Sequence, residues 1–328
     1  MIRFALAPLL LAAALAGAPA AASAAASVAT PVPAPEAMVE SGRCDHDCLV
    51  GLVDQYLAAM IAHDPERLPL RQGVRFTENG QTLRLGDGLW GTIEGLGDFR
   101  LYAADPLAGQ AVYFGVVKES GRLVEISLRL KVVGRKISEI ETLVVRNTSM
   151  GGGDAMPVGG LVANPVFGEI LPAAQRRPRE ELIRIANSYF EGLEQATGRI
   201  TPFEPECGRV EGSMVTSNDP KAPKGSMQSL SCGAQFALGF SPFITEVRGR
   251  RFLVVDEARG LVFAMLSFDH AGRIKSVNLT DGTTMKVPPP FDAPFSFLMG
   301  ELFKIRDGRI ARVQAVISTT PYAMPSGW

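Results

Sequence analysis

The chain carries almost no net charge, since 33 Lys and Arg residues balance 34 Asp and Glu residues. Proteins that bind nucleic acid usually present a basic face, so this balance argues against a nucleic-acid partner. After the N-terminal segment no apolar run approaches the ~18 residues of a membrane span. The serine-hydrolase pattern Gly-x-Ser-x-Gly is also absent. These absences argue against several functions and leave the actual one open.

The N-terminus predicts export. Arg3 precedes an apolar run from Phe4 to Ala16, and the small residues at 22–24 suit a signal peptidase. The mature protein is then expected to be periplasmic or secreted, with no membrane attachment after cleavage. We predict the following segments: signal peptide 1–24, Ala/Pro-rich tether 25–43, first domain 44–148, linker 149–177 and second domain 178–328.

The chain has only four cysteines, which is an even number. Disulfides persist in exported proteins, and proximity along the chain favours Cys44 with Cys48 and Cys207 with Cys232 among the possible pairings. The spacing of Cys44, His46 and Cys48 resembles that of metal ligands. Because no second cluster completes such a site, we expect disulfides, no metal and no cofactor.

Two amphipathic helices are predicted, and their apolar positions correspond one to one. The i, i+3, i+4 pattern of a one-faced helix occurs at 49–60 and again at 182–193. Later landmarks recur in the same order: Asp105-x-x-x-Gly109 is matched by Asp256-x-x-x-Gly260, each followed by an apolar strand. Similarity of this kind in a fixed order predicts one structural unit used twice.

One pair of strands is predicted with its register. Apolar and polar residues alternate from Val124 to Val132, as in a half-buried antiparallel strand. Pairing Arg129 with Glu141 and Lys131 with Glu139 places opposite charges side by side, and Leu130 then meets Ile140. Both faces of the strand therefore favour the same register.

After the first helix, residues Glu66–Leu70 predict a short second helix in the first copy. Two helices followed by a curved antiparallel sheet, repeated in both copies, resemble the nuclear transport factor 2-like, or SnoaL-like, superfamily. Several segments also resemble a two-copy family of exported proteins classed as a domain of unknown function: Cys44-x-x-x-Cys48-Leu49, Thr77-Glu78-Asn79-Gly80, Gly86-Asp87-Gly88-Leu89-Trp90, Glu301-Leu302-Phe303-Lys304-Ile305 and Pro321-Tyr322-x-Met324-Pro325-x-x-Trp328. The resemblance implies an α+β fold of two tandem cystatin-like cones, each with N-terminal helices and a curved antiparallel sheet.

Candidate catalytic residues come from matching positions in the two copies. Tyr56 and Tyr189 lie on the predicted first helices, where a hydroxyl can reach a cavity or lie satisfied in the core. Glu78 recurs as Glu211, and each follows an arginine, Arg75 or Arg209. A carboxylate held by a guanidinium is a candidate pocket acid, although a structural turn is an equal alternative.

Two further candidates are Trp90 and His270, of which His270 has no equivalent in the first copy. Trp90 offers a flat wall for a ligand, or it packs in the core. His270 titrates near neutral pH, and the comparable place in the first copy holds Lys118-Glu119; the alternative is an ordinary turn through Asp269 and Gly272. The second copy also has two insertions, Ser217–Ser226 and Lys286–Pro294, which cover a binding mouth or simply tolerate length.

The family resemblance implies a cone pocket of the kind that often performs proton transfer without a cofactor. We therefore hypothesise a binding protein for a small apolar molecule. The alternatives are a cofactor-free lyase, isomerase or dehydratase that uses Glu, Tyr or His, and an interaction module without chemistry. The protein is expected to be a monomer with an internal pseudo-dimer, or a homodimer.

Overall fold

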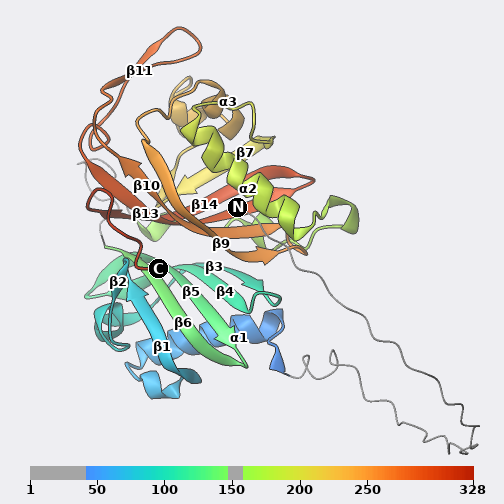
Figure 1. The fold of residues 1–328 in the computed structure, drawn as a ribbon, viewed down its shortest axis with the longest axis vertical. Helices are drawn as coiled ribbons and strands as arrows, with labels where there is room; N and C mark the ends of the chain where they lie inside the picture. The colour runs from blue at the N-terminus through green and yellow to red at the C-terminus, as the bar shows by residue number, and fades with distance from the viewer. Residues whose placement is uncertain (1–41, 147–157) are drawn as a thin grey trace, which may run out of the picture. The chain divides into compact units, whose positions relative to one another are not determined.

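The computed structural model describes residues 42–146 and 158–328, which form mostly β structure. Most strands belong to two six-stranded sheets, ordered β2-β1-β6-β5-β4-β3 and β8-β7-β14-β13-β10-β9 (Figure 1). A separate hairpin consists of β11 and β12. The predicted signal peptide, nearly all of the tether and the first part of the linker lie outside the described residues.

The first sheet contains β1 (Leu70–Glu78), β2 (Gln81–Thr82), β3 (Ile93–Asp105), β4 (Gln110–Glu119), β5 (Arg122–Val133) and β6 (Lys136–Val145). The second contains β7 (Phe203–Glu211), β8 (Met214–Val215), β9 (Glu246–Asp256), β10 (Leu261–His270), β13 (Phe295–Arg306) and β14 (Arg309–Thr320). The small hairpin is β11 (Ser276–Asn278) and β12 (Thr284–Lys286).

The helices of the described residues are α1 (His46–Ile61), α2 (Arg179–Glu194) and the short α3 (Cys232–Ala237). Single 3₁₀ turns are η3 (Pro65–Arg67), η4 (Gly88–Gly91), η5 (Val158–Gly160), η6 (Pro165–Gly168), η7 (Ala173–Gln175) and η8 (Met227–Ser229). Both long helices were predicted, and both are confirmed. The side chain of Asp45 begins α1 by accepting a hydrogen bond from the Cys48 amide at 2.9 Å.

The predicted fold class, two α+β cones of the nuclear transport factor 2-like type, is wrong. The stretch expected to form a second helix makes only the turn η3. The sheets are mixed and not antiparallel, because β1 runs parallel to β6 and β7 runs parallel to β14. Hydrophobic periodicity indicates that a segment is a strand, but it holds no information on the direction in which that strand joins its sheet.

The predicted register of the β5–β6 hairpin is confirmed. Arg129 lies opposite Glu141, Leu130 opposite Ile140 and Lys131 opposite Glu139, with a register shift after Lys131. Arg129 donates hydrogen bonds to Glu141 at 2.9 Å and to Glu139 at 2.8 Å. Both disulfides are present as well, joining Cys44 to Cys48 and Cys207 to Cys232.

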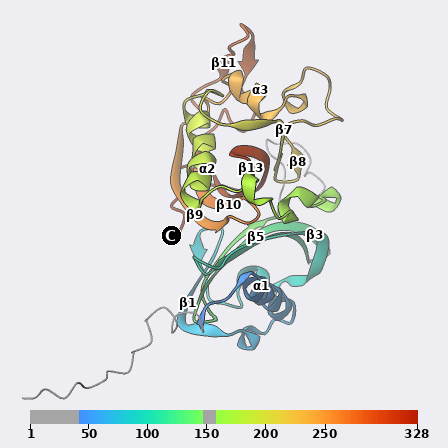
Figure 2. The same cartoon turned by 90° about the vertical axis from the view of Figure 1, so that its right-hand side faces the viewer.

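Each sheet packs one face against its own long helix. One core cluster joins α1 to the first sheet and another joins α2 to the second (Figure 2). A third cluster combines side chains from both sheets, and in it the rings of Phe114 and Phe263 lie 5.7 Å apart. The helix-facing sides of the two sheets are therefore separate cores.

The strand registers place corresponding rows of residues on these helix-facing sides. We call them the Glu78 row, which runs across the first sheet as Glu78, Thr142, Leu128 and Tyr113, and the Glu211 row, which runs across the second as Glu211, Ala315, Glu301 and Ala264. Residues directly opposite one another in neighbouring strands project to the same face. Glu78 and Glu211 thus occupy the same register position, whereas Glu301 stands where the first sheet has Leu128.

Candidate functional site

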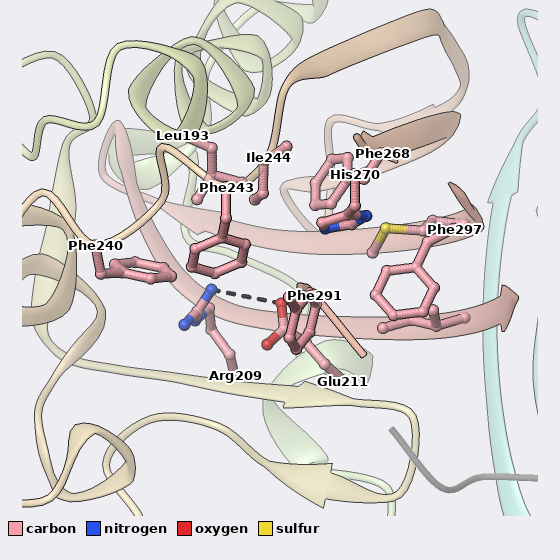
Figure 3. Close-up of a pocket in the computed structure, with 12 residues that line it drawn as sticks. Leu193, Arg209, Glu211, Phe240, Phe243, Ile244, Phe268, His270, Phe291 and Phe297 are labelled. Atoms are coloured by element: carbon pink, nitrogen blue, oxygen red, sulfur yellow. Dashed lines mark hydrogen bonds and ion pairs between the residues drawn. The ribbon is translucent and has the colours of Figure 1, made fainter. Parts of the chain in front are cut away.

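A cavity opens on the helix-facing side of the second sheet. Its empty space is about 500 Å³, the part open to solvent included. The residues that line it come from α2, from four strands of the sheet and from two loops: Leu193, Arg209, Glu211, Phe240, Phe243, Ile244, Phe268, His270, Phe291, Phe297, Met299 and Ile317 (Figure 3). Most of these side chains are apolar, and five of them are phenylalanines.

Aromatic rings form the wall of the cavity. The Phe243 and Phe291 rings lie 5.1 Å apart, and Phe243 stacks on His270 with ring centres 6.2 Å apart. Phe291 belongs to the Lys286–Pro294 insertion, so this loop contributes to the cavity. Phe243 lies between α3 and β9. Rings in tilted and stacked contact hold one another in place, so the wall is built before any ligand arrives.

The floor of the cavity holds the only charged pair of the lining. Arg209 and Glu211 project side by side from β7 and form an ion pair at 3.4 Å (Figure 3). Arg209 also donates to the Tyr189 hydroxyl on α2 at 2.8 Å and to the Gln235 side chain on α3. Burial opposes its charge, but Glu211 and Tyr189 keep the pKa of Arg209 above its usual range. The guanidinium is therefore fixed from three elements and stays charged.

Tyr189 helps to hold Arg209 in the cavity floor. Its side chain is fully buried, and burial raises the pKa of its hydroxyl well above the usual value. The phenol is thus neutral and accepts the hydrogen bond from Arg209. The structure brings together Tyr189, Arg209 and Glu211, three of the candidates predicted from the sequence.

His270 lines the same cavity from the end of β10. His270 is part of the strand, whereas the alternative interpretation placed it in a turn. Its ring stacks on Phe295 with centres 4.4 Å apart, and burial lowers the pKa of the imidazole to about 4 despite the nearby Asp269. The imidazole is therefore neutral at physiological pH and is a weak proton acceptor there.

The candidates of the first sheet lie in a closed core. The Trp90 indole donates to the Tyr56 hydroxyl at 2.7 Å, and both side chains are buried. Glu78 accepts from the Leu89 amide at 2.8 Å and pairs with Arg146 at 3.2 Å. Because these bonds occupy the Tyr56 hydroxyl and the Glu78 carboxylate, neither group is available to a ligand. The arrangement is typical of a structural core.

Arg75 lies on the other face of the first sheet. Its guanidinium stands over the Trp328 ring, 4.0 Å from the ring centre, and away from Glu78. Side chains alternate between the two faces along a strand. A spacing of three residues separates Arg75 from Glu78 onto opposite faces, whereas the spacing of two keeps Arg209 and Glu211 together.

Gln235, Phe243, Phe291 and Glu301 were not predicted as site residues, although Phe291 lies in the Lys286–Pro294 insertion. The signal for Glu301 is a charged residue in the alternation Phe297, Met299, Glu301, Phe303, whose other members are apolar and face the helix. Gln235 gives no such signal, because its role depends on α3 lying over β7. Within residues 42–146 and 158–328, no three His, Cys, Asp or Glu side chains gather as metal ligands would.

Residues 175–317 match the model of a domain of unknown function, DUF8021. This segment contains every residue that lines the cavity. A search of the curated proteins gave no match. None of the helices in the described part of the chain has the length and hydropathy needed to cross a bilayer.

Three solved structures are similar to parts of the chain at low identity. A protein from Sphaerobacter thermophilus is 15% identical, with 30% of this chain and 96% of that one covered and a TM-score of 0.25. A “Putative Isomerase” from Bacillus subtilis is 12% identical (42% and 87% covered, TM-score 0.26). AclR from Streptomyces galilaeus, described as “a putative hydroxylase”, is 14% identical (43% and 91% covered, TM-score 0.26). The function proposed below rests on the cavity and not on these similarities.

Proposed function

We propose that this is an exported protein that binds a small apolar molecule in the cavity of the second sheet. The observation that carries the proposal is the lining itself: a wall of aromatic rings over a floor with one ion pair. Ligand sites are typically concave and mostly apolar, with a few polar groups that orient the ligand. The flat rings favour an aromatic or polycyclic ligand, and Arg209 with Glu211 would orient a polar edge of it.

The binding proposal is tested with protein purified from its own producing cells. Native mass spectrometry should show a retained small molecule, and a panel of aromatic and polycyclic compounds should raise the melting temperature of the emptied protein. Ile244→Trp should remove the shift by filling part of the cavity that Ile244 lines. Ile200→Trp is the matched control, because it adds the same ring at an exposed position outside the lining. Absence of both a retained molecule and any shift would refute the binding function.

Export is the second part of the proposal. Two disulfides support it, because they persist in oxidising compartments outside the cytosol. Cell fractionation followed by mass spectrometry of the mature N-terminus is the test. We expect the protein in the periplasm or the medium, with its first 24 residues removed. A full-length chain in the cytosol would contradict this part alone.

A proton-transfer enzyme without a cofactor is the second candidate function. It is favoured by the carboxylate of Glu211, which faces the cavity beside a fixed guanidinium. Glu211 would accept a proton from a carbon next to a carbonyl group and return it to another carbon, as in an isomerase. His270 is a poor base at neutral pH, since its pKa is about 4. With any bound compound identified, unchanged turnover in Glu211→Gln would exclude this mechanism.

A further inference from the structure

Glu301 is a buried carboxyl group below the floor of the cavity. It lies on β13 and is 0% exposed, and neither of its oxygens makes a hydrogen bond of ordinary geometry among residues 42–146 and 158–328, although the Tyr189 hydroxyl interacts with it and lowers its pKa. Burying a polar group without a partner costs free energy. Such a group in a folded protein calls for an explanation other than stability.

The Glu211 row places this carboxyl beside the site. Ala315 lies opposite both Glu211 and Glu301, so one methyl side chain separates the two glutamates, whose α-carbons are about 10 Å apart at the usual strand spacing. On the other side the row continues with Ala264. The next row contains Ile317 and Met299, which line the cavity. Within its row, Glu301 is thus separated from Glu211 in the cavity floor only by Ala315. The neighbouring row of the sheet lines the cavity.

The groups that face Glu301 define its charge. Burial raises the pKa of Glu301 well above its usual value; Glu211 adds to this effect, and Arg209 and Tyr189 oppose it. From the other elements packed around the row, α3 presents the uncharged Gln235, and β10 presents Ala264 and, farther along, the neutral His270. With Glu301 protonated, Arg209 and Glu211 cancel and the floor is neutral.

We propose that Glu301 determines which ligands the cavity accepts: as a neutral carboxylic acid it keeps the floor uncharged, so the site selects uncharged aromatic molecules over charged ones of the same shape. The inference rests on the proposed binding function and narrows its ligand class. Loss of the Glu301 proton gives the floor a net negative charge. The cavity then favours an aromatic cation, whose attraction to ring faces adds to that charge.

The test uses three probes with one ring system: naphthalenemethanol, naphthylmethyl-trimethylammonium and naphthalenesulfonate. Calorimetric titration at pH 7 should show the neutral alcohol binding best. As the pH is raised from 7 over the range in which the protein stays folded, the ratio of cation to alcohol affinity should rise about tenfold once Glu301 loses its proton, the size expected for one added charge at this range in a partly polar medium. Tyr189 and Arg209 keep their protons over this interval, because the pKa of each is raised above its usual value.

Glu301→Gln is the decisive variant, since it has the shape of the protonated acid and cannot ionise. It should bind the alcohol as the unmodified protein does and show no rise in cation affinity. Glu125→Gln is the matched control. Glu125 is also buried without a partner among the described residues, but it lies on β5 of the first sheet, outside the cavity. This variant should keep the rise.

The outcomes separate the two proposals. If none of the probes binds, the cavity function fails and the selectivity inference falls with it. If the alcohol binds but Glu301→Gln keeps the pH-dependent rise, only the inference about Glu301 is overturned. Infrared spectroscopy gives an independent readout: the carbonyl band of a protonated carboxyl at pH 7 should weaken in Glu301→Gln, or in Glu301→Leu if the glutamine variant does not fold. An unchanged band overturns the inference.

Discussion

The Glu78 row and the Glu211 row show how one strand arrangement supports a closed core in one sheet and a cavity in the other. In the first sheet Glu78 is engaged by the Leu89 amide and Arg146, and the row continues with Thr142, Leu128 and Tyr113. In the second sheet Glu211 faces the cavity, and Glu301 replaces the leucine. The acid is satisfied in one sheet and left available in the other.

The aromatic residues of the two sheets show the same contrast between a closed core and a cavity. Trp90 fills the core of the first sheet and donates to Tyr56. In the second sheet Tyr189 instead receives a hydrogen bond from Arg209, and the rings of Phe243 and Phe291 stand around open space. Large side chains thus fill one interior and surround a cavity in the other. Differences at single positions, together with the loops that contribute Phe243 and Phe291, account for the contrast, since the strand order of the two sheets is the same.

Exchanging the residues at the matched position should produce the largest effect. Leu128→Glu places a carboxyl in the dry core of the first sheet, and we expect it to lower the unfolding free energy by about 3 kcal/mol or more. Glu301→Leu removes an unpaired buried carboxyl, and we expect it to raise that free energy by about 1–3 kcal/mol. Urea unfolding monitored by circular dichroism measures both. A destabilised Glu301→Leu would show that the glutamate supports the fold.

The two disulfides should differ in the stability that they contribute. Cys207 and Cys232 are 25 positions apart, and Cys44 and Cys48 are 4 apart. In the chain-entropy account the longer loop is worth about 3–4 kcal/mol and the shorter about 2 kcal/mol. Replacing each pair by serines and measuring urea unfolding tests this order. Equal losses would mean that the bridge between β7 and α3 does not hold the second sheet more firmly.

The paired tyrosines give a smaller contrast. Tyr56→Phe leaves the buried Trp90 N–H without its acceptor, and we expect a loss of about 1–3 kcal/mol. Tyr189→Phe should cost less, because Arg209 retains Glu211 and Gln235 as partners. The urea unfolding midpoints of the two variants, measured at one pH, test this order of stability losses. A larger loss for Tyr189→Phe would place the main stabilising contact in the second sheet.

Local patterns predicted the parts of the fold that depend on neighbouring residues. The helices follow from apolar spacing, and the β5–β6 register follows from the charges of Arg129 and Lys131. The fold class failed because β1 and β7 join their sheets in parallel, a long-range pairing without a local signal. For the site, the sequence paired Arg209 with Glu211, whose spacing of two on β7 keeps them on one face, and singled out His270 apart from them. The meeting of His270 with this pair depends on the order of β7, β14, β13 and β10, and no local pattern expresses that order.

Acid should weaken the second sheet at a higher pH than the first. His270 is held neutral: its pKa is about 4, against about 6.5 for an exposed histidine. The unfolded chain binds the proton first, so the stability that His270 contributes is present above about pH 6.5 and is lost as the pH falls toward 4. Glu119 is the last residue of β4, as His270 is of β10. A hydrogen bond from Arg146 lowers the pKa of Glu119, so its contribution is lost only at more acidic pH.

Unfolding in urea at pH 7 and pH 5 separates these two effects. The native protein should lose about 1–2 kcal/mol from the His270 effect over this interval, at about 1.4 kcal/mol per pKa unit. His270→Gln removes the titrating group and should lose correspondingly less, while Glu119→Gln should keep the full loss. If Glu119→Gln flattens the dependence and His270→Gln does not, acid weakens the closed first sheet before the cavity. The contrast between the two sheets would then not extend to their response to pH.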